Sequence, residues 1–157
     1  MTMDAQRLGR LLNDLAPALM AMARGRCRHA EDVVQQAFVA LIGQAREPEN
    51  PAAWLFGAVR QLALARAREE ARRERREEAA ARTEGTIPPD PARTLDLAEA
   101  LAVLDADDRD MVLARVHGGL SFEEIGLVAG ISASTAWRRY QAAMETVRAR
   151  MEGWNES

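Results

Sequence analysis

The segment at residues 83–93 constrains the fold of this chain more than any other feature of the sequence. It reads TEGTIPPDPAR, with three prolines, one glycine and few apolar residues. Proline lacks a backbone N–H and its ring clashes with the preceding helical turn, so no helix passes through this segment. The segment therefore divides the 157 residues into two parts, each long enough for only one small domain.

The residues before this segment predict three helices. Apolar residues recur at helical spacing over 5–24 and again over 30–44, with Pro17 the one expected interruption. Asn50 followed by Pro51 predicts the start of a third helix, because asparagine caps helix N-termini and proline suits the first helical position. Aromatic residues make up 4% of the chain and alternating β-branched runs are absent, which favours an all-α fold.

The residues after the segment also predict helices, and the whole chain predicts two small helical domains. Short helices are expected over 95–104 and 107–117. The predicted boundaries are a first domain at 1–78, a flexible linker at 79–94 and a second domain at 95–157. Charge differs between the halves: residues 1–76 carry a net charge of +4 and residues 77–157 a net charge of −7. The positive charge is concentrated at 60–76, which holds seven arginines.

Several classes of protein do not fit the sequence. No window approaches 18 uninterrupted apolar residues, and charged residues occupy the N-terminal positions of a secretory segment, so we expect a cytoplasmic protein with no membrane insertion. Cys27 is the only cysteine, and with His29 and His117 as the only histidines a zinc site would lack ligands. No nucleophile, base and orienting group converge in a motif, so neither an enzyme nor a bound cofactor is expected.

Residues 120–140, LSFEEIGLVAGISASTAWRRY, have the spacing of a helix-turn-helix. Ser121 and Glu124 form a capping-box pattern, and Gly130 can adopt the left-handed conformation that ends a helix. Ser132 then caps a second helix, whose first turns carry hydroxyl groups and two adjacent arginines suited to phosphates and bases. The alternative is that Ser132 is only a cap and that Arg138 and Arg139 are only solvated.

Three motifs in this order resemble the extracytoplasmic-function (ECF) sigma factors of the sigma-70 family. AEDVVQQAFVAL is similar to their region 2.1 to 2.2 helix, NPAAWLFGAVRQLALARAR to regions 2.3 and 2.4, and GLSFEEIGLVAGISASTAWRRYQAAMETVRARM to region 4.2. The resemblance implies a promoter-specificity subunit that binds core RNA polymerase. Its domain 2 would melt a −10 element and its domain 4 would read a −35 element.

The resemblance also implies roles for individual residues. The helix over 30–41 would dock on the clamp helices of the polymerase β′ subunit, with Val33, Ala37 and Phe38 turned inward. Domain 4 would meet the β flap, and an anti-sigma factor is a further implied partner. The polymerase-binding candidates are Asp32, Gln35 and Gln36. The −10 candidates are Trp54, Arg60, Gln61, Arg66 and Arg68. The −35 candidates are Ser132, Ser134, Thr135, Trp137, Arg138, Arg139 and Gln141.

Some of these assignments have alternatives within the sequence. Trp54 either stacks an unpaired base or packs in the core beside Leu55 and Phe56. In the family the loop around AREPENP reads a −10 base, and in the recognition helix we assign Arg139 to the DNA backbone and Arg138 to base edges. An alternative function is a sigma-like regulator or adaptor that binds DNA or protein without directing initiation.

Overall fold

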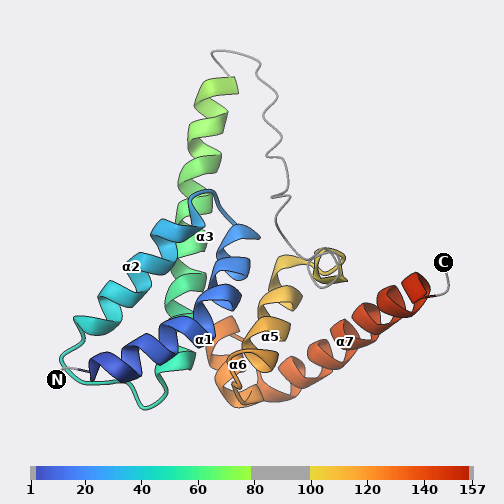
Figure 1. Cartoon of the computed structure of the whole chain (residues 1–157). Coiled ribbons are helices and arrows are strands. Elements are labelled where there is room, and N and C mark those ends of the chain that lie inside the picture. Colours follow the sequence, from blue (N-terminus) through green and yellow to red (C-terminus); the bar gives the residue numbers. More distant parts are fainter. Residues whose placement is uncertain (1–2, 79–99, 156–157) are drawn as a thin grey trace.

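The computed structural model describes residues 3–78 and 100–155, with side chains up to residue 153. Every regular element in these ranges is a helix, which confirms the all-α fold (Figure 1). Residues 100–102 are helical as well, while the predicted linker at 79–94 and the first part of the predicted 95–104 helix lie outside the described residues. The labelled helices are α1 Ala5–Arg24, α2 Ala30–Ile42, α3 Pro51–Glu78, α5 Ala106–Val116, α6 Phe122–Ala129 and α7 Ala133–Asn155.

Helices α1, α2 and α3 pack against one another and form the first part of the molecule (Figure 1). The α1 helix begins after Asp4, whose carboxylate accepts a hydrogen bond from the Gln6 backbone N–H at 3.3 Å. It runs without a break through Pro17, so the expected interruption does not occur. Buried residues on both sides of the proline, Leu15 and Leu19 among them, hold the helix in place and offset the one lost hydrogen bond.

The inward face of α2 agrees with the sequence prediction. Val33, Ala37 and Phe38 are all buried. They pack against α1 and α3, with Leu55, Phe56, Val59 and Ala63 contributing from α3. Asn50 caps α3 as predicted, because its side-chain oxygen accepts a hydrogen bond from the Ala53 N–H at 3.2 Å. Beyond Ala63 no residue of α3 is fully buried, and the helix projects past its neighbours (Figure 1).

Helices α5, α6 and α7 form the second part. Asp105 caps α5 by accepting a hydrogen bond from the Asp108 N–H at 2.8 Å. The α5 helix buries Met111, Leu113 and their neighbours against α6 and α7. The Arg115 guanidinium lies 4.5 Å from the centre of the Phe122 ring, where the ring face attracts a cation.

The two parts touch, which the sequence analysis did not predict. The α1 helix packs against α5, and α3 packs against α6. Their buried residues belong to one hydrophobic cluster that runs from α1 to α7. The single charged residue among the buried positions described is Asp110, which lies in this junction.

Cys27 and His29, the residues considered as metal ligands, have ordinary surroundings. Cys27 is half-buried, its thiol donates to the Ala23 carbonyl at 3.5 Å, and burial raises the pKa of that thiol. His29 is exposed and has a positive φ of 56° immediately before α2. Within the described residues no three His, Cys, Asp or Glu side chains gather as metal ligands. Across the same ranges, no helix is both long and apolar enough to span a bilayer.

Candidate nucleic-acid interface

Helices α6 and α7 form a helix-turn-helix whose turn is built by local chemistry. Ser121 and Glu124 complete a reciprocal capping box at the start of α6, as the sequence predicted. Gly130 ends α6 with φ 73° and ψ 33°, the left-handed conformation in which a side chain is strained. Gly126 faces the turn so closely that a Cβ placed on it would lie 2.5 Å from the Ile131 carbonyl oxygen.

The first turns of α7 present most of the predicted −35 residues to solvent. The Ser132 hydroxyl accepts a hydrogen bond from the Thr135 N–H at 3.1 Å, so Ser132 caps the helix and remains exposed. Thr135 is half-buried and accepts a hydrogen bond from Arg138 at 3.3 Å. Trp137 is 50% exposed although it is a large apolar side chain. The exposed members of the set are Ser132, Ser134, Trp137, Arg138 and Gln141.

Arg139 differs from its neighbour Arg138, because its guanidinium is already paired within the domain. Its Nη2 lies 2.9 Å from Asp108 Oδ1, and its Nε donates to the same oxygen at 3.1 Å. Asp105 is 3.9 Å away. The acidic start of α5 therefore neutralises a side chain that the sequence assigned to DNA phosphate.

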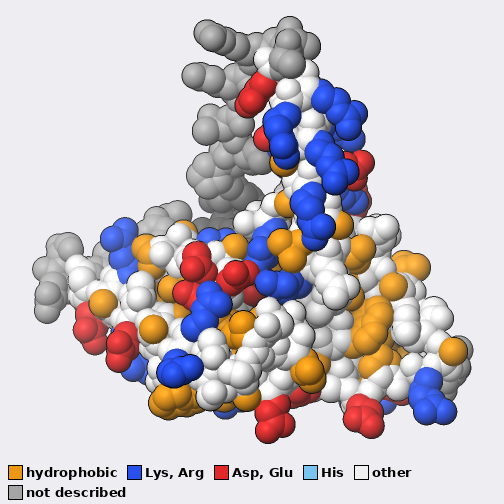
Figure 2. Space-filling model, turned by 180° about the vertical axis from the view of Figure 1, so that it is seen from behind, with side chains coloured by type: hydrophobic (Ala, Val, Ile, Leu, Met, Phe, Trp, Pro, Cys, Tyr) orange, Lys and Arg blue, Asp and Glu red, His pale blue; other side chains and the backbone are white. Residues whose placement is uncertain are grey.

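The predicted −10 residues are distributed along α3. Trp54 is half-buried and packs against the core, while Gln61 and Arg68 are exposed. Arg66 is half-buried near the middle of the helix. Figure 2 shows arginine side chains in a column along the projecting part of α3. Positive charge arranged in this way attracts phosphate without reading sequence.

The predicted polymerase residues share one surface groove. Asp32, Gln35 and Gln36 are all exposed on α2, on the side opposite its buried residues. Together with Val39 and Arg66 they line a groove of about 360 Å³. Val39 is 62% exposed there, so the groove combines polar side chains with an apolar one, as protein interfaces do.

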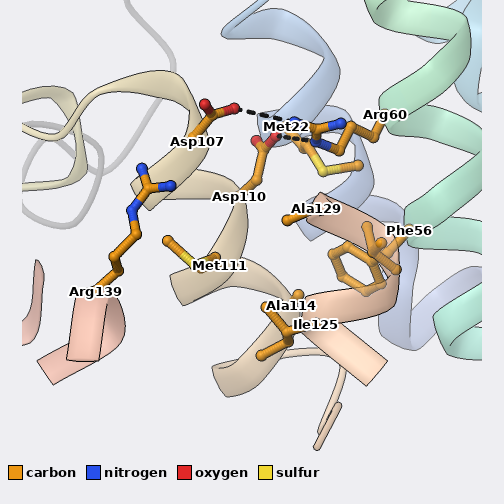
Figure 3. A pocket seen from close by; sticks show the side chains of 11 residues that line it. Met22, Phe56, Arg60, Asp107, Asp110, Met111, Ala114, Ile125, Ala129 and Arg139 are labelled. Carbon is orange, nitrogen blue, oxygen red and sulfur yellow. Dashed lines mark hydrogen bonds and ion pairs between the residues drawn. The ribbon is translucent and has the colours of Figure 1, made fainter. Parts of the chain in front are cut away.

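The junction between the two parts contains four charged residues, which we call the ion cluster: Arg26, Arg60, Asp107 and Asp110. Arg26 Nη2 donates to Asp107 Oδ1 at 2.6 Å and to Asp110 Oδ2 at 2.7 Å. Arg60 Nη2 donates to Asp107 Oδ1 at 3.2 Å, and its Nε lies 4.0 Å from Asp110 Oδ2 (Figure 3). Arg60, predicted to contact DNA, is therefore held by the second domain.

The two carboxylates of the ion cluster respond to it in opposite ways. Hydrogen bonds from Arg26 and Arg60 hold the pKa of Asp107 below its usual value, against the effect of partial burial. Burial raises the pKa of Asp110 to about 6, and attraction to the same two arginines offsets only part of that effect. Ionisation of Asp107 is thus favoured in this arrangement, whereas ionisation of Asp110 is opposed by the loss of its hydrating water.

Apolar and polar contacts surround the ion cluster. Phe56 is fully buried and lines a cavity of about 30 Å³ with Met22, Met111 and Ile125, room for about one water molecule (Figure 3). At the edge of the junction the Asn50 side-chain amide donates a hydrogen bond to a Glu124 carboxylate oxygen. Asn50 belongs to the loop before α3, and Glu124 belongs to the helix-turn-helix. In the sigma factors that this chain resembles, the corresponding loop reads a −10 base. Here that loop is hydrogen-bonded to the helix-turn-helix.

Comparison with known proteins identifies the two parts. Residues 11–73 match Sigma-70 region 2, and residues 94–147 match Sigma-70, region 4. The RNA polymerase sigma factor CarQ of Myxococcus xanthus is 32% identical over 127 residues, which span 76% of this chain and 72% of CarQ. The chain belongs to the sigma-70 family. It is an ECF-type sigma factor, so it directs RNA polymerase to promoter DNA.

A solved structure has the same fold as this sigma factor. It is the sigma factor RpoE in complex with the anti-sigma factor NepR from Bartonella quintana. The TM-score is 0.66 at 23% identity, and the match covers 92% of this chain and 95% of that chain. At this identity the likeness extends to the fold, with region 2 and region 4 arranged as two helical units.

Sequence reasoning missed the ion cluster altogether. Arg26 was not a candidate for any role, and Asp107 entered only as the first residue of the helix expected over 107–117. Arg26 lies 81 and 84 residues from its two partners, and Arg60 lies 47 residues from Asp107, so no local spacing connects them. The only available signal was the density of aspartate at 105–110, DADDRD, in a chain rich in arginine.

Proposed function

We propose that this sigma factor binds core polymerase through the groove on α2 and contacts promoter DNA through α3 and the start of α7. The observation that carries the proposal is that α2 keeps Asp32, Gln35 and Gln36 exposed while its other face is buried. These three side chains point away from the domain core, so they are available to the β′ clamp helices. Region 4 would meet the β flap.

The DNA contacts divide between the two domains. Ser132, which caps α7, and Ser134 and Arg138 within α7 are exposed at the N-terminal end of the second helix of a helix-turn-helix, which is the end that enters a major groove. On α3, Arg66 and Arg68 supply positive charge for the backbone of a melted −10 strand. Gln141 extends the first surface by one turn, and Trp54, Arg60 and Gln61 extend the second.

The remaining expectations concern the setting of this activity. A promoter-specificity subunit needs no catalytic group, so the protein would not be an enzyme and would act in the cytoplasm beside the polymerase. The structurally similar RpoE was solved with an anti-sigma factor, which supports an anti-sigma partner for this chain too. The domain boundaries at 1–78, 79–94 and 95–157 belong to the same proposal.

Charge reversal on α2 tests the polymerase contact. Asp32→Arg together with Gln36→Ala changes two exposed side chains, so the fold should remain intact while co-elution with core polymerase weakens at least about tenfold. The matched control is Glu31→Arg with Gln44→Ala, also exposed but outside the groove. Equal co-elution of both variants with the parent would remove α2 from the interface.

Run-off transcription tests the function itself. Core polymerase with this protein should produce discrete transcripts from a genomic fragment library, and core alone should not. Co-elution without any transcript would instead indicate an adaptor that does not direct initiation.

A further inference from the structure

The loop between α2 and α3, residues 43–50, is tied to the first turn of α1 by one ion pair. Arg7 Nη1 of α1 lies 2.5 Å from Glu47 Oε1 of the loop. Figure 1 shows the start of α1 beside the loop that leaves the end of α2. The N-terminal turn of α1 therefore holds the segment that leads into α3.

This ion pair differs from a pair of freely exposed side chains, because its carboxylate is largely removed from water. The Glu47 side chain is 16% exposed and the Arg7 side chain 50% exposed. Glu47 Oε1 itself is buried, and no described residue donates it a hydrogen bond of good geometry. Exposed pairs contribute little, but removing the partner of a buried carboxylate leaves its charge uncompensated. Without Arg7, Glu47 would have to leave this position to regain water.

Both partners of the ion pair belong to stiff parts of the backbone. On α1, Leu8 and Leu11 pack against the core on either side of the turn that carries Arg7. In the loop, Pro48 follows Glu47 and is half-buried. A proline fixes its own φ and restricts the residue before it to an extended backbone. The contact between Arg7 and Glu47 therefore fixes the path of the loop and not only one side chain.

The same loop borders the surface proposed to contact the −10 element. Trp54 lies in the first turn of α3, directly after the loop, and Gln61 and Arg68 are exposed further along that helix. Arg46, the residue before Glu47, is exposed and makes no ion pair or hydrogen bond with any described residue. A cation without a competing carboxylate is available to the phosphates of a melted strand. The loop thus extends the proposed −10 surface beyond the start of α3.

We propose that Arg7 is a positioning residue for −10 recognition, which acts through Glu47 to hold the 43–50 loop, and Arg46 with it, against the melted −10 strand. The inference rests on the proposed function, since it takes the start of α3 as a −10 contact. Arg7 itself touches no DNA in this arrangement. Recognition of a base requires its contacts to be held within about 0.5 Å. A displaced loop therefore loses discrimination between bases while the arginines of α3 still attract the strand.

Arg7→Ala in the full chain tests the proposal in run-off transcription with core polymerase. The template is a promoter from the genomic fragment library with its −10 element randomised, and transcripts are counted by sequence. The yield ratio of best to worst base should fall at least about fivefold at one or more −10 positions, the lower end of what one base contact contributes. The −35 preference and co-elution with core polymerase should not change. A merely structural role would lower all transcripts in proportion and leave the ratio as in the parent.

Two further variants and one control establish how Arg7 acts. Arg7→Met keeps most of the apolar stem and removes the charge, so it should give the same fall in the ratio. In a Glu47→Ala chain, Arg7→Ala should lower the ratio no further, because the pair is already absent. Arg10→Ala, exposed one turn further along α1, removes the same charge and should keep the ratio of the parent.

The outcomes separate this inference from the proposed function. If the parent transcribes and Arg7→Ala and Arg7→Met keep its −10 preference, the inference is wrong while the proposed function stands. An equal fall for Arg7→Ala with and without Glu47, or for Arg10→Ala, would also overturn it, as would a parent that transcribes with no −10 preference. A parent that gives no transcript with core polymerase would instead refute the proposed function.

Discussion

Arg138 and Arg139 are adjacent in sequence but differ in what each guanidinium already binds. Arg139 donates one hydrogen bond to Asp108 from Nε and makes an ion pair with it through Nη2, so DNA would have to displace a carboxylate before a phosphate could bind this arginine. Arg138 is exposed and donates a 3.3 Å hydrogen bond to Thr135 on its own helix. A phosphate that replaces a carboxylate on an arginine stabilises the DNA complex less than a phosphate that replaces water. The reason is that the arginine then has a charged partner both in the free protein and in the complex.

The two arginines should therefore give different mutational signatures in −35 binding. If Arg138 reads base edges as proposed, Arg138→Ala should cost roughly 1–3 kcal/mol on the best site, with relaxed preference at one base pair. If Arg139 binds the DNA backbone as proposed, Arg139→Ala should lower the slope of log affinity against log salt by about one unit on every sequence. The measurement is duplex affinity at several salt concentrations, on the best site and on single-base variants.

Arg148→Ala, exposed further along α7, is the control and should change neither quantity. If both test variants bind every sequence and salt condition like the parent, the arginines are only a solvated face of α7.

At the scale of helices, the sequence was informative wherever local chemistry determines the result. Asn50 caps α3 as predicted, and Ser121 with Glu124 forms the expected capping box, because each bond joins residues three apart. The buried face of α2 followed from helical periodicity. The pairing of Asp108 with Arg139 could not be predicted in this way, since 31 residues separate them. Contacts of this kind depend on how helices pack, which no local pattern encodes.

The turn of the helix-turn-helix depends on a missing side chain. A Cβ on Gly126 would meet the Ile131 carbonyl oxygen at 2.5 Å, and that oxygen belongs to the backbone of the turn. Gly126→Ala should therefore lower the free energy of unfolding by about 2 kcal/mol through overpacking. Gly9→Ala is a matched control, because nothing lies within 4 Å of its Cβ position in α1, and it should raise stability by roughly 0.5–1 kcal/mol. Urea unfolding measures both, and equal stability of the two variants would contradict the close approach at Gly126.

At the scale of the whole molecule, contact between the two domains changes the surroundings of Asp110, and we call the arrangement with the domains in contact the closed form. In the closed form burial raises the pKa of Asp110 to about 6, although Arg26 and Arg60 face it and favour its charge, and Asp107 opposes it. Separation would return this carboxyl to water and its pKa toward 3.8. The closed form therefore binds a proton more tightly than the open form does, and acidification favours closure.

Closure should consequently strengthen as the pH falls from 7 to 5. The stabilising contribution is fully present below the open-form pKa and is lost as the pH rises through about 6, so the closing equilibrium should shift about tenfold over this interval. The lowered pKa of Asp107 acts in the opposite sense, but only at more acidic pH. Energy transfer between dyes at Gln44→Cys and Ala149→Cys, in a Cys27→Ser chain, measures the closed fraction.

Asp110→Asn provides the control for this titration. It keeps the side-chain shape but cannot ionise, so its closed fraction should lack the pH dependence attributed to Asp110. If the parent and Asp110→Asn change identically between pH 5 and 7, another group governs the response and burial of this carboxyl does not.

The bond between Asn50 and Glu124 also joins the starts of two helices. The Asn50 side chain accepts from the Ala53 N–H at 3.2 Å while its amide donates to Glu124, which itself accepts from the Ser121 N–H at 2.9 Å. In amide hydrogen exchange, the N–H protons of Ala53 and Ser121 would both be protected by this pair of linked caps. One opening event, the loss of the bond between Asn50 and Glu124, would expose both. A sigma factor that opens on its polymerase would therefore lose protection at the beginnings of α3 and α6 together, with no change in total helix content.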